Sequence, residues 1–498
     1  MVDASCIIAL DQGTTSTRAL AFTPAGTPVA MAQRELPQHY PRSGWVEHDP
    51  KQIWDHTVTV LGEACASART AGYTPACLGL TNQRETVVLW DRRTGEPIHR
   101  AIVWQDRRTA DRTAALRRAG HEDAVRERTG LLLDPYFSAT KIAWILDQVE
   151  GARAAAEAGH LAFGTIDSFL LWRLTGGRHA SDMTNAARTS LLDLDSGHWD
   201  PALGDLFRVP AALLPELLPN AGDFGRTDPD ATGLDLPITG MAGDQQAATV
   251  GQACFDPGMV KSTYGTGCFL LQNTGGARAR SDHRLLSTIA YEVNGRRTFA
   301  LEGSIFVAGA ALQWLRDGVG VIASSGESAA LASGLADNHG VYLVPAFTGL
   351  GAPHWDPDAR GLLTGLTRDT GPAHLARAAL EAVAYQTDDL VRALAADSGA
   401  RAAQIRIDGG MAENDWFAQF LADIVTVTVD RPRITETTAL GAAMLAGVGA
   451  GIFADLTEAR AAWSLERRFE PHMAVAERVR LRHGWQAALS RALTTPGS

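Results

Sequence analysis

The stretch CIIALDQGTTSTRALAF, residues 6–22, gives the clearest indication of the expected fold. Its two apolar ends are typical of buried strands. In the polar turn between them, Gly13 permits a tight bend, and successive hydroxyls and N–H groups can surround phosphate oxygens. The same turn could be a simple polar hairpin in which Asp11 acts as a local cap. With a further strand expected at residues 29–33, this hairpin-rich start differs from a Rossmann domain.

The second half of the chain repeats this arrangement. Strands are expected at residues 259–263 and 268–272, on either side of a Gly-rich turn at residues 264–267. Asn294-Gly295 indicates a further hairpin, because this dipeptide favours a two-residue turn. Two copies of strand, phosphate-sized turn and strand predict a duplicated α/β fold with a cleft between its halves.

The length of the chain also predicts two domains. At 498 residues the chain exceeds what one hydrophobic core usually covers, so we expect domains at residues 1–252 and 253–498. Periodicity and breaker residues predict the remaining elements. Helices are expected at residues 50–71, 106–118, 140–150, 305–316, 374–394, 414–423, 439–449 and 474–493, and strands at 76–80, 86–90, 287–293, 298–301 and 404–408.

Composition narrows the class of protein. The 45 Lys and Arg against 56 Asp and Glu give a net charge of -11, which disfavours nucleic acid or an anionic membrane as a partner. The five cysteines are scattered and never spaced as CxxC, so we expect reduced, mostly buried thiols rather than disulfides or a zinc site. No stretch reaches the ~18 apolar residues of a membrane span and no basic leader is visible, so we expect a cytoplasmic protein. The basic pair Arg107-Arg108 is interpreted as a solvated helix face.

Three polar turns are candidates for nucleotide binding. The sequence contains no GxxxxGK[ST] motif, which disfavours a Walker-type ATPase. Phosphates could instead be held by the turn at residues 13–16 and its counterpart at 264–267, while Asp11 could orient a hydrated Mg²⁺. A strand that ends in Gly409-Gly410 lets backbone approach a flat adenosine closely, although a plain strand-to-helix turn is the alternative.

The acceptor side of the site is predicted at two segments. Arg84 and Glu85 place opposite charges side by side between apolar strands, where unpaired burial would be costly. A polyol would satisfy both groups, because its hydroxyls both accept and donate hydrogen bonds. An internal ion pair or a solvated loop is the alternative. Asp244 is the candidate general base, since phosphoryl transfer needs only a carboxylate that orients the attacking hydroxyl, and its alternative role is a helix N-cap.

These segments resemble the FGGY carbohydrate kinases over nearly the whole chain. Residues 136–148, YFSATKIAWILDQ, resemble the first signature of that family, and residues 361–381 resemble its second. The resemblance implies a pair of actin-like, ribonuclease-H-like ATPase domains with a central cleft, in agreement with the duplicated hairpins. Four further segments resemble the family members that phosphorylate glycerol: DQGTTSTR at 11–18, NQRET at 82–86, IVWQDRRT at 102–109 and GDQQ at 243–246.

The same resemblance implies a reaction and the residues that carry it. Those family members convert glycerol and MgATP to sn-glycerol 3-phosphate and ADP, which here implies catalytic roles for Asp244 and Asp11 and a Mg²⁺ held by the same two carboxylates. The glycerol site would comprise Arg84, Glu85, Tyr136, Asp244 and Gln245 at the hydroxyls, with Trp104 and Phe269 packed on the carbon chain. The nucleotide would contact Thr14, Thr15, Ser16, Arg18, Thr266, Gly309, Gln313, Gly410 and Asn414. A homodimer or homotetramer is expected by the same likeness.

Two features of family control are not recognisable in the sequence. Members inhibited by fructose 1,6-bisphosphate carry a Gly-Gly-rich, Arg-containing loop, whereas residues 225–233 are more acidic and lack that pattern. Other members are activated by phosphorylation of a histidine, which lies in the same region of their sequences. Residues 220–243 of this chain contain no histidine. Two rival functions stay open: a kinase for another polyol or a ketose, and an actin-like ATPase that acts as a polymer subunit or chaperone.

Overall fold

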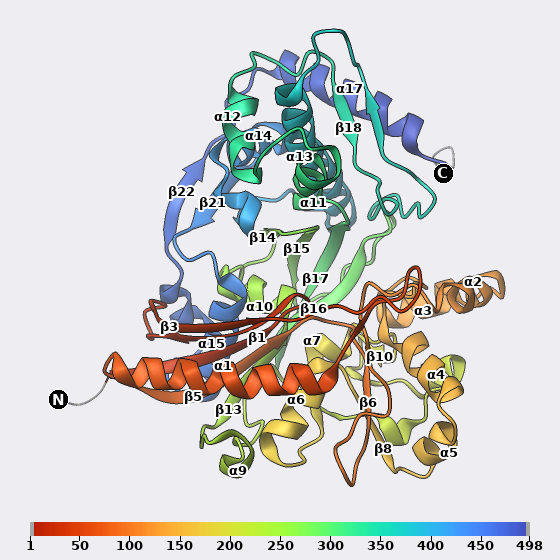
Figure 1. The fold of residues 1–498 in the computed structure, drawn as a ribbon, viewed down its shortest axis with the longest axis vertical. Helices are drawn as coiled ribbons and strands as arrows, with labels where there is room; N and C mark the ends of the chain where they lie inside the picture. Colours follow the sequence, from red (N-terminus) through yellow and green to blue (C-terminus); the bar gives the residue numbers. More distant parts are fainter. Residues whose placement is uncertain (1–3, 495–498) are drawn as a thin grey trace.

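Two mixed β-sheets form the centres of the two halves of the molecule (Figure 1). The computed structural model describes residues 4–494. The first sheet has the order β13-β5-β1-β2-β3, with β1 at Ala4–Gln12, β2 at Ser16–Phe22, β3 at Pro28–Glu35, β5 at Tyr73–Asn82 and β13 at Ile238–Gly243. The first three strands form the predicted antiparallel hairpins, in which Leu10 lies opposite Ala19, whereas β5 is parallel to both β1 and β13.

The second sheet repeats the pattern of the first. Its seven strands follow the order β16-β17-β15-β14-β20-β21-β22. Within it, β17-β15-β14-β20-β21 has the same relative directions as β3-β2-β1-β5-β13, two antiparallel contacts followed by two parallel ones. The strands are β14 (Val260–Tyr264), β15 (Cys268–Gly275), β16 (Leu286–Val293), β17 (Arg296–Ile305), β20 (Gln404–Asp408), β21 (Thr428–Pro432) and β22 (Leu465–Phe469). The duplication expected from the sequence is therefore present in the strand order.

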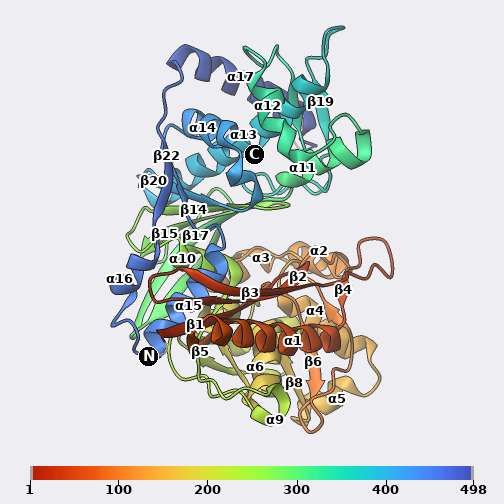
Figure 2. The ribbon, with the colours of Figure 1, turned by 60° about the vertical axis from the view of Figure 1, so that its left-hand side comes forward.

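Helices from both halves of the chain cover the first sheet. On one face lies α1 (Pro50–Thr70), and on the other lies α15 (Thr437–Gly449), which comes from the second half. Alternation along β1 explains this, because Ile8 packs toward α1 whereas Ile7 packs toward α15. The helix α10 (Asp244–Gly251) continues directly from β13 and packs against α15 where the two halves meet (Figure 2).

The close approach of α10 and α15 depends on glycine. A Cβ atom on Gly441 of α15 would lie 1.8 Å from the backbone oxygen of Ala247, and one on Gly251 of α10 would lie 1.9 Å from that of Thr437. Real Cβ atoms do not approach other atoms within 3.0 Å, so a side chain at either position requires the helices to separate. The two halves therefore touch through their backbones at this crossing.

A long insertion between β5 and β13 builds one side of the first half, with its own apolar core around Leu89, Ile142 and Phe163. It begins after β5, and its strand β7 pairs with β4 (Glu47–His48), which precedes α1 in the chain. The inserted elements are β6 (Val88–Asp91), β7 (Ala101–Ile102), α2 (Ala110–Arg118), α3 (Glu122–Thr129), α4 (Ser138–Gln148), α5 (Ala152–Glu157), β8 (Leu161–Gly164), α6 (Ile166–Thr175), β9 (Ala180–Asp182), α7 (Met183–Ala186), β10 (Leu192–Asp193), β11 (His198–Trp199), α8 (Pro201–Phe207), β12 (Glu216–Leu218) and α9 (Pro229–Thr232).

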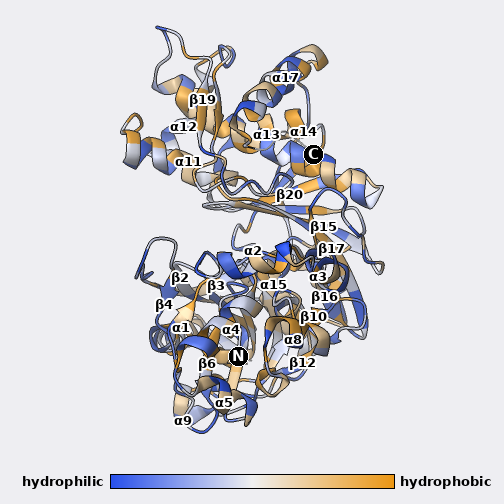
Figure 3. Cartoon of the chain, turned by 90° about the vertical axis from the view of Figure 1, so that its right-hand side faces the viewer, coloured by the Kyte–Doolittle hydropathy of each residue, from blue (hydrophilic) through white to orange (hydrophobic). Residues whose placement is uncertain are grey.

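Most helices of the second half cover the side of its sheet that points away from the first half (Figure 1). Apolar residues gather in the sheets and in the helices that cover them (Figure 3). The predicted C-terminal helix packs on this core through Leu481, Trp485 and Leu489. The elements are α11 (Gly309–Gln313), α12 (Ser328–Ser333), β18 (Tyr342–Val344), β19 (Leu362–Thr364), α13 (Pro372–Ser398), α14 (Asp415–Val425), α16 (Leu456–Ala459) and α17 (Val475–Ala492).

Two predicted helices begin later than the sequence suggested. Ile305 is the last residue of β17, where it pairs with Cys268, and α11 begins only at Gly309. Residues 103–109 are not helical either, because their backbone forms hydrogen bonds with residues 44–46. In both places a strand or a long-range backbone contact competes successfully with local helical periodicity.

Arg108 corrects the interpretation of the basic pair as a solvated face. Its side chain is fully buried and pairs with Glu47 and Asp106, each at 2.8 Å. Its guanidinium also lies 3.9 Å from the centre of the Trp45 ring. Arg107, in contrast, is largely exposed. The partners of Arg108 include residues about sixty positions away, which the local sequence does not indicate.

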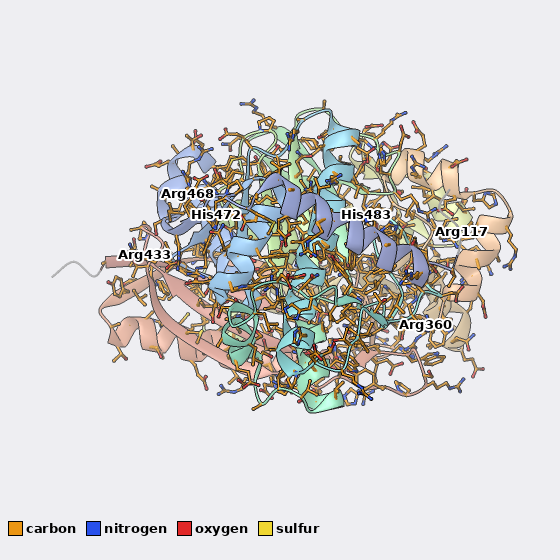
Figure 4. All side chains as sticks on the ribbon, turned by 90° about the horizontal axis from the view of Figure 1, so that it is seen from above. Arg117, Arg360, Arg433, Arg468, His472 and His483 are labelled. Atoms are coloured by element: carbon orange, nitrogen blue, oxygen red, sulfur yellow. The ribbon has the colours of Figure 1, made fainter. Side chains whose placement is uncertain are left out.

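Three further observations concern the cysteines and the outer surface. All five cysteines are buried and free, as predicted. Within residues 4–494, none of the helices has the length and apolar character needed to cross a membrane. The basic side chains labelled in Figure 4, among them Arg117, Arg433 and His483, are spread across the width of the molecule.

Candidate active site

Arg84 lies at the centre of a cluster of buried charges. It follows the end of β5, and its side chain is only 2% exposed. Nη1 and Nη2 donate to the two carboxylate oxygens of Glu302 at 2.6 and 3.1 Å, and Nε lies 3.3 Å from Oδ1 of Asp244. The pairing of Arg84 with its neighbour Glu85 is weaker, at 3.9 Å. Both side chains are buried, so the alternative of a solvated loop is wrong, whereas internal ion pairs are present at both residues.

Glu85 is held instead by an arginine that the sequence analysis missed. Arg188, just after α7, donates from Nε to Glu85 at 2.6 Å and from Nη2 to Glu302 at 3.0 Å. Glu85 has a φ of 58°, a left-handed conformation that costs non-glycine residues on the order of 1–3 kcal/mol. Such a backbone persists because the surrounding bonds over-determine it, including the one from Ser138 Oγ to the Glu85 carbonyl oxygen at 3.0 Å.

Three aromatic rings enclose the same cluster. The Trp104 ring meets Tyr136 and Phe269 edge to face, with centroids 5.6 and 6.0 Å apart. The Arg84 guanidinium lies 5.9 Å from the Phe269 ring, and that of Arg188 lies 5.5 Å from the Tyr136 ring. The rings therefore supply apolar walls next to the charged groups.

Asp244 is the first residue of α10, directly after β13. The helix N-cap is Gly243, so the alternative of Asp244 as an N-cap is wrong. Its Oδ1 accepts from the backbone N–H of Gln245 at 2.7 Å. Burial raises the pKa of Asp244 to about 6, while the nearby Arg84 cation works in the opposite direction. A carboxyl with this pKa is ionised at neutral pH and is basic enough to take a proton.

Gln245 is oriented by a buried lysine, which the sequence analysis also missed. Nζ of Lys261, on β14, donates to Oε1 of Gln245 and to Oγ1 of Thr263, the latter at 2.8 Å. Burial lowers the pKa of Lys261, an effect that the carboxylates of Asp408 and Asp244 oppose. Because its oxygen is engaged with Lys261, the Gln245 amide keeps its NH₂ group as a hydrogen-bond donor.

The first predicted phosphate turn, residues 13–16, lies against Trp104 and the charged groups next to it. These groups, Arg84, Glu85, Arg188, Asp244 and Glu302, are called the acceptor cluster below. Gly13 donates its backbone N–H to the Ser16 carbonyl at 2.9 Å, and Trp104 Nε1 donates to Thr14 Oγ1 at 2.9 Å. Thr15 is exposed at the tip of the turn. Arg18 is paired with Asp11, at 2.6 Å, and with Glu436, the residue before α15, also at 2.6 Å.

The second phosphate turn lies beside the strand that ends in two glycines. Gly309 N donates to Gly265 O at 3.0 Å, which brings the start of α11 onto the turn that carries Thr266. Gly409 has a φ of 84°, and a Cβ atom there would lie 2.5 Å from the Tyr264 carbonyl oxygen. Thr266, Gly309 and the Gly409-Gly410 step are therefore grouped together.

Gln313 and Asn414 lie on the elements that follow these turns. Gln313 is exposed at the end of α11. Asn414 caps α14 by accepting from the backbone N–H of Phe417 at 3.0 Å, and its Nδ2 donates to Ser328 Oγ at 3.3 Å. Both side chains belong to the second half of the chain, as do Thr266 and Gly309.

The carboxylates of the site fit a hydrated cation better than a protein-built metal cage. Among residues 4–494, no three His, Cys, Asp or Glu side chains are grouped so that they could hold a metal ion. The predicted pair, Asp11 and Asp244, lie near enough for the Asp11 charge to help raise the pKa of Asp244. Carboxylate oxygens of this kind are the donors that Mg²⁺ accepts, with waters and substrate phosphates completing its shell.

Comparison with known proteins gives a consistent result along the chain. A model for the N-terminal domain of the FGGY family of carbohydrate kinases matches residues 6–251, and a model for the C-terminal domain of that family matches residues 260–450. The glycerol kinases of Rhodospirillum centenum and Methylobacterium nodulans are 60% and 59% identical to this chain, covering 99% and 98% of it and equal shares of their own lengths. The crystal structure of Plasmodium falciparum glycerol kinase with ADP superposes with a TM-score of 0.92 at 35% identity, covering 99% of each chain.

Proposed function

The chain belongs to the FGGY family of carbohydrate kinases, and we propose that it transfers the γ-phosphoryl group of ATP to glycerol. The reaction yields sn-glycerol 3-phosphate and ADP. The observation that carries the proposal is the cluster of buried Arg84 and Glu85 with part-buried Asp244, next to three aromatic rings. Its charged groups can form hydrogen bonds with hydroxyls, and its rings can pack against a short carbon chain.

In the proposed reaction, a terminal hydroxyl oxygen of glycerol attacks the γ-phosphorus. A new P–O bond forms, the bond to the β–γ bridging oxygen breaks, and ADP leaves with the electron pair of that bond. Asp244 accepts the hydroxyl proton, while Arg84, Glu85, Tyr136 and Gln245 hold the other hydroxyls. Trp104 and Phe269 pack on the carbon chain and exclude water, which would otherwise compete as the acceptor.

The nucleotide is proposed to lie between the two phosphate turns. Backbone N–H groups and hydroxyls of both turns surround phosphate oxygens. Asp11 and Asp244 would hold Mg²⁺ with ATP, and the ion would neutralise charge on the phosphates. The proposed nucleotide contacts are Thr14, Thr15, Ser16, Arg18, Thr266, Gly309, Gln313, Gly410 and Asn414.

Three broader expectations accompany this function. The division of the chain near residue 252, the assembly into a homodimer or homotetramer, and a cytoplasmic location stay predictions. The family models that match residues 6–251 and 260–450 support the first of them.

A coupled assay for ADP tests the function directly. We expect ADP release to depend on glycerol, with kcat/KM for glycerol about tenfold or more above that for dihydroxyacetone, xylulose or gluconate, because a site built for particular hydroxyls discriminates strongly. A matched reaction without acceptor measures plain ATP hydrolysis. Equal use of xylulose would favour a ketose kinase, and ADP release independent of any acceptor would favour the actin-like ATPase.

The pH dependence of kcat/KM for glycerol is expected to follow the protonation of Asp244. With its pKa raised to about 6, the carboxyl is protonated below that pH and can no longer accept the hydroxyl proton. We expect kcat/KM for glycerol to fall by about tenfold per pH unit below pH 6 and to level off above it. Initial rates measured from pH 4.5 to 8, with circular dichroism to verify folding, test this. A rate that stays constant between pH 5 and 7 would argue against Asp244 as the base.

A further inference from the structure

Glu302 is a buried carboxylate that bonds to both arginines of the acceptor cluster. It lies in β17, in the second half of the chain, and its side chain is 0% exposed. Its two oxygens accept from Arg84 at 2.6 and 3.1 Å and from Arg188 at 3.0 Å. These two arginines hold the pKa of the Glu302 carboxyl down at about 2, against the effect of burial. Glu302 is therefore ionised whenever the protein is folded near neutral pH.

We propose that Glu302 is a positioning residue for the acceptor, which fixes Arg84 directly and Glu85 through Arg188. The inference rests on the function proposed above and adds to it a residue from the other half of the chain. No role in proton or phosphoryl transfer is assigned to Glu302. Its role is to set the direction in which the guanidinium of Arg84 faces.

The sheet anchors Glu302 firmly enough for this role. β17 lies between β15 and β16, and Glu302 pairs with Leu271 on one side and Leu286 on the other. On the adjoining strand, Phe269 lies opposite Ser304, so Phe269 and Glu302 share one face of the sheet. The same stretch of sheet therefore presents both an aromatic wall and the carboxylate that orients Arg84.

The geometry at Arg84 shows what this orientation achieves. Glu302 engages both terminal nitrogens of the guanidinium, and the remaining Nε faces Asp244 at 3.3 Å. A terminal nitrogen turned toward Asp244 as well would add a second contact to this ion pair and compete further for the oxygens that must accept the hydroxyl proton. Glu302 thus limits the pairing of Arg84 with Asp244 to the single Nε contact.

Glu302 is the carboxylate that the two arginines share. Each arginine also faces one proposed glycerol ligand, Asp244 for Arg84 and Glu85 for Arg188. Replacing Glu302 by a neutral residue leaves both buried guanidinium groups without their shared partner. The arginines would then turn to the carboxylates that remain, which are the proposed glycerol ligands.

The test compares Glu302→Gln with a matched control, Glu381→Gln. Glu381, on α13, is also a buried glutamate paired with an arginine, Arg377 at 2.7 Å, but it lies outside the acceptor cluster. We expect E302Q to raise the KM for glycerol by about 30-fold or more, as removal of one partner from a buried charged pair does, with the KM for ATP changed less than about twofold. E381Q should lose thermal stability and keep the wild-type KM for glycerol.

Glu302→Asp keeps the inference testable if E302Q does not fold. Its shorter side chain retains the charge but cannot reach both arginines equally, so we expect a KM for glycerol between those of wild type and E302Q. A purely structural role would instead lower stability and leave the KM for glycerol of either Glu302 variant within about twofold of wild type. That result would reject the inference. Failure of the wild-type protein to use glycerol at all would reject the proposed function, and the variants would then be compared on its best acceptor.

Discussion

Asp244→Asn is expected to lower kcat for glycerol phosphorylation by about 10² to 10⁴-fold. The amide keeps the size of the side chain but cannot accept the hydroxyl proton. Its oxygen can still accept from the Gln245 backbone N–H, so the start of α10 should be unchanged. Binding of ATP without Mg²⁺, measured by calorimetry, should stay within about threefold of wild type, because Asp244 is not among the proposed nucleotide contacts. The expected pattern is therefore a loss in kcat rather than a loss of structure.

Asp389→Asn provides a matched control for this variant. Asp389, on α13, is a second part-buried carboxyl, and burial raises its pKa to about 7. It accepts from Trp485 Nε1 at 2.8 Å and lies outside the acceptor cluster. We expect the control to turn over glycerol at the wild-type rate. Turnover of glycerol by D244N within tenfold of wild type would contradict the assignment of Asp244 as the general base.

Gly441→Ala is expected to lower the free energy of unfolding by about 3 kcal/mol or more, at or above the upper end of typical overpacking costs. The added Cβ would lie 1.8 Å from the Ala247 backbone oxygen, and no rotamer change can move a backbone atom. Relief requires α15 to move away from α10, which also disturbs the packing of α15 on the first sheet. Thermal melting and the soluble yield measure the loss.

Gly62→Ala is the matched control for this substitution. Gly62 lies inside α1, where a Cβ atom meets nothing within 4 Å. Alanine has the higher helix propensity, so we expect the control to be unchanged or more stable by up to about 1 kcal/mol. Equal stability of the two variants would show that the two halves adjust freely at the crossing of α10 and α15, which would contradict their close backbone contact.

Much of the fold could be predicted from local sequence signals. The two polar turns, each between apolar strands, predicted hairpins that are present in both halves with the same strand order. The turn at Asn294-Gly295 is also present, because both residues adopt positive φ there. The predicted helix starts at residues 106 and 305 are wrong, because a short stretch of sequence does not show backbone pairing with distant residues.

The residues of the candidate site also fall into those that local sequence signals predict and those that depend on a distant partner. Arg84, Glu85 and Asp244 stand out in the sequence because charged residues follow apolar strands. Arg188 and Glu302 do not, since they lie 103 and 218 residues from the partners they bind. The burial of Arg108 was missed for the same reason. Side chains whose chemistry depends on a distant partner carry no signature of their own, so only the folded arrangement identifies them.

The position of α15 has a consequence for how the protein is made. This helix covers one face of the first sheet, yet it begins at Thr437, roughly 200 residues after β13 completes that sheet. At ribosomal rates of about 5–20 residues per second, the nascent sheet waits on the order of ten to forty seconds for its cover. During that interval the apolar face around Ile7 and Ala9 is open to other chains and to chaperones. The first half is complete as a sheet long before it is complete as a folded unit.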